Sequence, residues 1–179
     1  VDQLVHGRLD QMFHMFDRLH QGFLNNLLVM RMVAGGLAND PTYGAYLDPS
    51  RRYYWGISQG GIEGGAYLAL SPDTTRGVLG VGASNYSTLL QRSGDFPQFE
   101  FILNQKYPNV LDQQLLFAII QQLWDRAEPQ GYLPHLIENP LPGTPAKKVL
   151  LQVGINDSQV PNIGTEIQVR SLGIPAIAP

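Results

Sequence analysis

Residues 53–70 read YYWGISQGGIEGGAYLAL, and this stretch decides the fold. Its first residues are aromatic and end at a glycine, which predicts a short strand over residues 53–55. Residues 62–70 are apolar or small and suit a helix that packs closely on a sheet. Between them, residues 56–60 (GISQG) have the form G-x-S-x-G and fall on the turn from strand to helix.

Predicted strands and helices alternate through the rest of the chain. Apolar residues recur at spacings of three and four over residues 9–28, which predicts a helix that ends at Gly35-Gly36. Further strands are expected over residues 78–82, 148–153 and 174–178, further helices over residues 111–124 and 162–172, and irregular structure over residues 83–108. This alternation predicts an α/β fold, with a mainly parallel sheet covered by helices on both faces.

Composition narrows the classes of function. The 179 residues suffice for one domain with a core, and 44% hydrophobic against 15% charged residues indicates a globular chain. A net charge of −3, with scattered basic residues, argues against nucleic-acid binding. The chain has no cysteine, which excludes disulfides, thiolate catalysis and cysteine-bound metals. We expect no transmembrane segment, because polar residues interrupt the longest apolar run, residues 23–37.

Ser58 is the candidate nucleophile. A serine on a sharp strand-to-helix turn is held in a strained backbone conformation that projects its hydroxyl above the sheet. The N–H of Gln59, at the helix start, would form half of an oxyanion hole. Gly56 and Gly60 are expected to make room, because a Cβ at either position would collide with a neighbouring element. The alternative is a chance G-x-S-x-G in a chain with 19 glycines, which the strand before it and the helix after it disfavour.

With this turn, the chain resembles the α/β-hydrolase superfamily in its serine esterase and lipase branch. The resemblance implies the chain order Ser, Asp, His, with the acid after a later strand. Asp157 matches that place, because it follows the strand expected over residues 148–153 and precedes Val-Pro and a helix. In this role its carboxylate would accept the ring N–H of the histidine. A turn or N-cap aspartate is the other interpretation of Asp157, and Asp95 and Asp125 are the competing acids.

The catalytic histidine is not identified. His6, His14 and His20 precede Ser58, and His135 precedes the acid, so none stands where the resemblance requires it. We therefore expect the histidine beyond residue 179, and residues 1–179 to be a partial α/β-hydrolase domain from the C-terminal half. A weak match of residues 5–7 (VHG) to the second oxyanion loop, and His135 as the base, stay open as alternatives.

The expected function is hydrolysis of a small-molecule or lipid carboxylic ester through an acyl-enzyme, without cofactor or metal. Residues 83–145 are predicted to form a cap-like insertion whose aromatic residues would line an acyl site: Phe96, Phe99, Phe101, Tyr107, Trp124 and Tyr132. The alternative function is a catalytically inactive, hydrolase-like binding or structural module. Peptidase, thioesterase and acyltransferase activities share the same machinery and stay open, as does the oligomeric state. An exported location is favoured over a cytoplasmic one.

Overall fold

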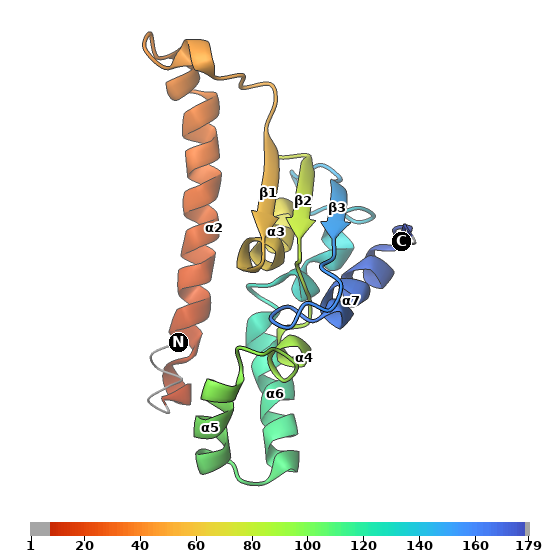
Figure 1. The fold of residues 1–179 in the computed structure, drawn as a ribbon. Coiled ribbons are helices and arrows are strands. Elements are labelled where there is room, and N and C mark those ends of the chain that lie inside the picture. Colours follow the sequence, from red (N-terminus) through yellow and green to blue (C-terminus); the bar gives the residue numbers. More distant parts are fainter. Residues whose placement is uncertain (1–7, 178–179) are drawn as a thin grey trace.

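Three parallel strands lie side by side in the computed structural model, which describes residues 8–177 (Figure 1). They are β1 (Tyr53–Ile57), β2 (Arg76–Gly80) and β3 (Lys148–Gln152), in the order β1-β2-β3. Ile57 pairs with Gly80, and Gly80 with Gln152, so the carboxyl ends of all three strands share one edge of the sheet. The α/β class is confirmed, with parallel strands connected through helices.

Six α-helices belong to the described residues. They are α2 (Phe13–Ala34), α3 (Gln59–Leu70), α4 (Tyr86–Leu90), α5 (Pro97–Lys106), α6 (Val110–Trp124) and α7 (Asn162–Leu172). Short 3-10 turns complete the order: η1 (Leu9–Gln11), η2 (Leu37–Asn39), η3 (Gly44–Tyr46), η4 (Pro129–Gly131) and η5 (Leu133–His135). The predicted bounds of α7 agree with the structure, and those of α2, α3 and α6 differ by one to several residues.

The main core lies between one face of the sheet and α3. Leu68 and Ala69 of α3 and Leu79 of β2 are fully or almost fully buried there, together with Leu136 from the connection that precedes β3. Glycines let α3 approach the strands closely: a Cβ on Gly61 would lie 2.3 Å from the Gly80 carbonyl oxygen. The small residues of this helix therefore serve close helix–sheet packing, as the sequence predicts.

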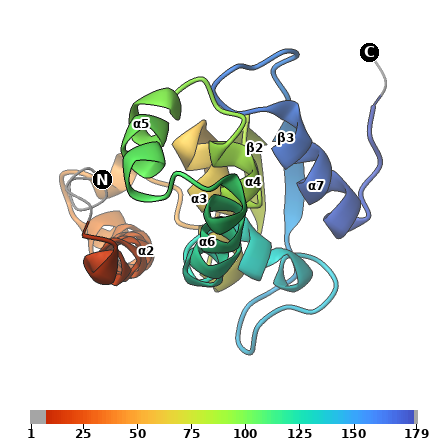
Figure 2. The same ribbon diagram turned by 90° about the horizontal axis from the view of Figure 1, so that it is seen from below.

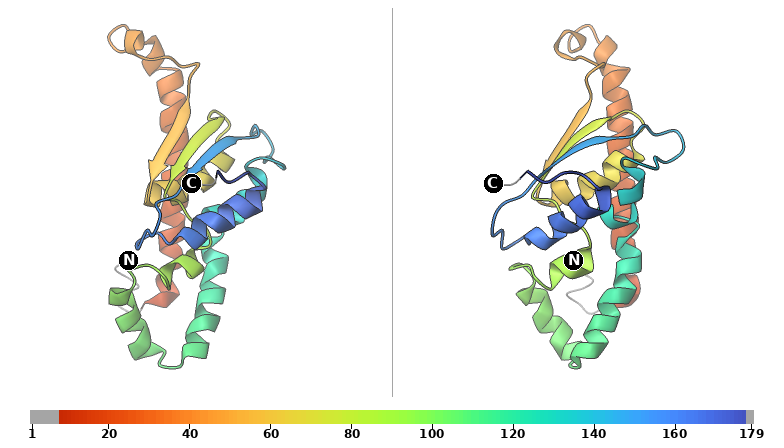
Figure 3. Two further views of the ribbon diagram at one scale, coloured as in Figure 1. Left: turned by 45° about the vertical axis from the view of Figure 1, so that its right-hand side comes forward. Right: turned by 90° about the vertical axis from the view of Figure 1, so that its right-hand side faces the viewer.

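The opposite face of the sheet carries no helix within residues 8–177, which corrects the expectation of cover on both faces (Figure 3). Large apolar side chains on this face are open to solvent: Tyr53 is 55% exposed, Trp55 67% and Leu150 52%. Their neighbours along β1 and β3 are partly buried on the other side, so exposure alternates along both strands. Such alternation is typical of a sheet that packs on one face only.

The first part of the connection between β2 and β3 lies beyond the carboxyl ends of the strands, and its later part, with η4 and η5, runs back beside α3 to the opposite edge (Figures 1 and 2). It contains α4, α5 and α6, so the expectation of irregular structure over residues 83–108 is wrong. Pro97 occupies the first turn of α5, where a proline needs no hydrogen-bond partner for its nitrogen. The side chain of Asn85 caps α4 by accepting from the backbone N–H of Thr88.

Two further sequence expectations need correction. The strand predicted over residues 78–82 begins at Arg76 and ends at Gly80, since Val81 takes a positive φ of 42°. No strand forms over residues 174–177, where Pro175 lacks an N–H for a ladder and Ile177 is 92% exposed. Residue 178, the last of that expected strand, lies outside the described residues.

Substitution of Gly61 tests the close approach of α3 to β2. We expect Gly61→Ala to lower the free energy of unfolding by about 3 kcal/mol or more, because the collision is with backbone that cannot rotate away. Gly22→Ala is the control, since a Cβ at Gly22 meets nothing within 4 Å. This change should raise stability by up to about 1 kcal/mol, as alanine favours helix over glycine. Urea unfolding checks both, and equal effects would contradict the packing described.

Candidate active site

The backbone of Ser58 is held from both sides. Its N–H donates to the Gly80 carbonyl at 2.9 Å, and its own carbonyl accepts from the N–H of Ile62 at 2.9 Å. The first bond extends the sheet and the second begins α3. Between them Ser58 takes φ 56° and ψ −121°, a conformation that favours glycine and costs an ordinary residue about 1–3 kcal/mol. The predicted strained turn is therefore present.

The hydroxyl of Ser58 is not used to cap the helix. Ser58 stands at the N-cap of α3, where a serine side chain usually accepts a backbone N–H, yet it makes no such bond. The side chain is exposed at the carboxyl edge of the sheet. Gln59 follows as the first residue of α3, and N–H groups at that position have no partner within the helix. Among residues 8–177, neither the Ser58 hydroxyl nor the adjacent Gln59 N–H has a hydrogen-bond partner.

The two glycines of the motif have different roles. A Cβ on Gly56 would lie 2.3 Å from the Gly60 carbonyl oxygen, so only glycine fits there. A Cβ on Gly60 would meet only the Tyr54 hydroxyl, at an ordinary 3.7 Å. The expected collision therefore holds at Gly56 and not at Gly60. The Gly60 carbonyl accepts from the Tyr54 hydroxyl at 2.6 Å, which ties the helix start to β1.

Ser58 and Gln59 line a cavity of about 190 Å³. Its other walls come from α4, from the segment after it and from the loop after β3, and include Tyr86, Asp95 and Gln159. The sequence indicates Asp95 only as a competing acid, and it does not indicate Tyr86 or Gln159. These residues reach Ser58 through tertiary folding, for which the chain carries no local signal.

The Gln59 side chain is fixed by two hydrogen bonds. It accepts from the Tyr86 hydroxyl at 2.8 Å and donates to Glu63 at 2.7 Å. Burial raises the pKa of Glu63 to about 7, and burial together with the nearby Glu63 carboxylate raises the pKa of Tyr86 to about 12. One oxygen of Glu63 is buried without a hydrogen-bond partner among the described residues. This row of side chains orients the residue that would supply the oxyanion N–H.

Glu128 fixes the start of α4 against α6. Its side chain is fully buried and accepts from the Tyr86 backbone N–H at 2.8 Å and from Gln121 at 2.6 Å. Burial raises the pKa of Glu128. Tyr86 is thereby held at its backbone by Glu128 and at its hydroxyl by Gln59, so its ring is a fixed wall of the cavity.

The two candidate acids lie in neighbouring loops. One oxygen of Asp157 accepts the backbone N–H groups of Gln159 and Val160, both at 2.9 Å, and no hydrogen bond of the described residues goes to its other oxygen. Asp157 does not line the Ser58 cavity, whereas Asp95 does. Asp95 accepts from the Gln159 side chain at 3.3 Å. Asp125 accepts from Gln121 near the end of α6, and it does not line the cavity.

No histidine of residues 8–177 lines the Ser58 cavity. His14 and His20 lie on α2, where His14 is exposed and His20 bonds the Arg126 carbonyl. His135 is at the opposite edge of the sheet, because the carbonyl of the next residue, Leu136, accepts from Lys147, directly before β3. A five-residue strand spans roughly 15 Å, so His135 is too far away to act as the base. His6 and the predicted second oxyanion loop lie outside the described residues.

The part of the chain that the structure describes contains no group of three or more side chains placed to bind a metal ion. Of its helices, none has both the length and the apolar character needed to cross a membrane. Comparisons with protein-family models, with curated proteins and with solved structures found no match. The chemistry of the site can therefore be inferred only from its own residues and their geometry.

The raised pKa of Glu63 predicts a pH-dependent stability. The folded state binds more protons than the unfolded state between pH 4.5 and about 7, so wild-type stability falls as the pH rises through this window. Glu63→Gln removes the charge and keeps an oxygen to accept from Gln59. We expect the variant to be more stable than the wild type by about 2–3 kcal/mol at pH 8 and to lose this gain near pH 4.

Urea unfolding at both pH values measures this difference. Glu100→Gln, which changes an exposed carboxylate on α5, is the control and should alter stability by less than about 0.5 kcal/mol at either pH. Wild-type and Glu63→Gln stabilities that run parallel from pH 4 to pH 8 would contradict the buried position of the carboxylate.

Proposed function

We propose that the protein is a serine hydrolase that cleaves carboxylic esters, with Ser58 as the nucleophile. The observation that carries the proposal is the backbone of Ser58, which holds an uncapped, exposed hydroxyl at the carboxyl edge of the sheet. Strain of this kind persists only where the surrounding structure enforces it, and it is concentrated at functional sites. A serine that merely capped a helix would need neither the positive φ nor the free hydroxyl.

The reaction follows from the neighbouring groups. The Ser58 oxygen attacks the ester carbonyl carbon while a base takes the hydroxyl proton, and the carbonyl oxygen becomes an oxyanion. The N–H of Gln59 donates to that oxyanion. The carbon–oxygen bond to the alcohol then breaks, and the alcohol leaves with the proton. Water attacks the acyl-serine in the same way, which releases the acid and restores the hydroxyl.

A base and an acid complete the proposal. The base is a histidine from outside residues 8–177, since no histidine of these residues lines the Ser58 cavity. Asp157 is the preferred acid, because two backbone N–H groups hold its carboxylate and leave one oxygen for an imidazole. Asp95 is the competitor, held only by a side-chain amide at 3.3 Å. An acid that orients a histidine lies behind the ring, so it need not line the cavity.

The α/β-hydrolase fold belongs to the same proposal. Its support is the parallel order β1-β2-β3, with the serine after β1 and Asp157 after β3. Of residues 83–145, expected to form a cap, the helices α4, α5 and α6 would serve as the cap, since they lie beyond the carboxyl edge where Ser58 stands. Residues 133–136 pack in the main core instead. A catalytically inactive binding module remains the second candidate, because no described histidine lines the Ser58 cavity.

A fluorophosphonate probe tests the nucleophile. We expect the probe to label the full-length protein at Ser58 and Ser58→Ala to abolish the label, because only an activated serine attacks such probes. Ser93→Ala is the matched control, since Ser93 lines the same cavity but stands outside the strained turn. It should keep the label. Mass spectrometry of the labelled peptide identifies the site, and labelling that survives Ser58→Ala would reject the proposal.

The same probe distinguishes the two acids. Asp157→Asn should slow labelling and ester hydrolysis at least a hundredfold, and by as much as about 10⁴, because the histidine would lose its orientation. Asp95→Asn should slow them less than tenfold. The reverse order of effects would transfer the acid role to Asp95. An absence of labelling in the unmodified protein would favour the binding module.

A further inference from the structure

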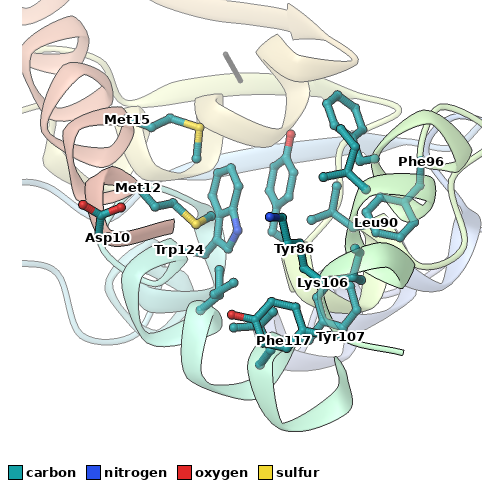
Figure 4. A pocket seen from close by; sticks show the side chains of 15 residues that line it. Asp10, Met12, Met15, Tyr86, Leu90, Phe96, Lys106, Tyr107, Phe117 and Trp124 are labelled. Carbon is teal, nitrogen blue, oxygen red and sulfur yellow. The ribbon is translucent and has the colours of Figure 1, made fainter. Parts of the chain in front are cut away.

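A second, larger cavity adjoins the one at Ser58. It has a volume of about 360 Å³ and lies between the start of α2 and helices α4, α5 and α6 (Figure 4). Its walls are mostly apolar, with Met12 and Met15 on one side and Leu116 and Ile120 of α6 among the others. Asp10 and Lys106, the charged residues of the lining, are both exposed and so lie where the cavity opens to solvent. We call this space the apolar chamber.

The apolar chamber shares four wall residues with the Ser58 cavity. These are Tyr86, Leu90, Phe96 and Phe99, which therefore stand between the two spaces. An acyl chain whose carbonyl carbon lies at Ser58 would pass along these four side chains. Of the aromatic residues predicted from sequence to line an acyl site, Phe101 and Tyr132 are absent from both cavities. Phe101 is 66% exposed, and the Tyr132 hydroxyl donates to the Arg126 carbonyl.

One wall of the apolar chamber carries a hydrogen-bond donor without a partner. Trp124 is only 6% exposed, and its indole Nε1 is buried with no hydrogen-bond partner among the described residues. Its ring stacks on Tyr86 at 3.9 Å and meets the edge of Phe16 at 4.8 Å, so its orientation is fixed. Figure 4 shows the indole nitrogen turned toward the interior of the chamber. A buried donor of this kind is costly unless an acceptor reaches it.

We propose that the apolar chamber binds the acyl chain of the substrate, and that this chain carries an oxygen atom that accepts from Trp124 Nε1–H. The inference rests on the proposed ester hydrolysis at Ser58 and adds the class of acyl group. A methylene takes up about as much space as a water molecule, ~30 Å³, so the chamber holds roughly a dozen methylenes at most. A hydroxylated or oxo acyl chain of up to about twelve carbons fits both the volume and the buried donor of Trp124.

Chain length is tested with p-nitrophenyl esters from acetate to hexadecanoate on the full-length protein. We expect kcat/KM to rise about fourfold for each methylene that enters the chamber, and to stop rising near twelve carbons. Ile120→Trp fills the chamber and should flatten the rise, with kcat/KM for each ester expressed relative to that of acetate in the same variant. Ile119→Trp, on the exposed face of the same helix, is the matched control and should keep the rise. An unchanged rise in Ile120→Trp would overturn the proposal.

The oxygen atom is tested with dodecanoyl esters that carry one hydroxyl at successive carbons. We expect one or two positions to be preferred about three- to tenfold over the unsubstituted chain, the gain typical of one hydrogen bond. Trp124→Phe keeps an aromatic ring and removes the N–H, so it should abolish this preference, measured as the ratio of kcat/KM for the hydroxylated ester to kcat/KM for the unsubstituted ester in the same variant. A preference that survives Trp124→Phe, or the absence of any preferred position, would overturn the assignment.

The experiments distinguish an error in the proposed role of the apolar chamber from an error in the proposed role of Ser58. Acetate hydrolysis that depends on Ser58 but shows neither chain-length nor hydroxyl selectivity rejects the chamber alone. If no Ser58-dependent hydrolysis exists, Trp124 fluorescence in a Trp55→Phe variant tests the chamber without catalysis, because these are the two tryptophans of the chain. Dodecanol should then give a saturable spectral shift and butanol none. A lack of any shift with dodecanol would reject the chamber as well.

Discussion

The backbone of Ser58 takes part in two hydrogen-bonded systems at once. Its N–H donates to the Gly80 carbonyl and so extends the sheet. Its carbonyl accepts from the N–H of Ile62 in the first turn of α3. Because strand and helix are each held by many other contacts, the residue between them has to accept a positive φ. The same constraint frees the hydroxyl from capping the helix and places it beside the N–H of Gln59. The proposed chemistry at Ser58 depends on this one turn.

Much of the fold could be predicted where local pattern and final environment agree. The helix at residues 162–172 has apolar periodicity and a terminal glycine, and Gly173 indeed ends it with a positive φ of 61°. The uncovered sheet face could not be predicted, because strands that alternate with helices usually form a sheet with helices on both faces. The side chains of β1 on the open face, Tyr53, Trp55 and Ile57, are also all apolar, as in a buried strand. Residues 97–106, within the segment expected to be irregular, form α5, and Pro97 stands at its first turn, where helices tolerate a proline.

The residues of the candidate site are likewise of two kinds, those that follow from the local motif and those that only tertiary folding brings together. Ser58, Gln59 and Gly56 lie within five residues of one another, so their arrangement follows from the local motif. Tyr86, Asp95 and Gln159 line the same cavity from the start of α4, the segment after α4 and the loop after β3, and no spacing in the sequence indicates that they meet. The burial of Glu63 could have been suspected from the sequence, because Glu63 is an acidic residue within a helix that is expected to pack closely on a sheet. A carboxylate in that place had to be buried and to find a partner, which it does in Gln59.

The strain at Ser58 is measured most directly by comparing two substitutions at that residue. Alanine keeps the Cβ that the positive φ disfavours, whereas glycine removes it. If the turn is strained, Ser58→Gly should be more stable to urea than Ser58→Ala by about 1 kcal/mol or more. At an unstrained position, glycine would instead be the less stable of the two, because it loses more conformational freedom on folding. That second result would contradict the account of the turn.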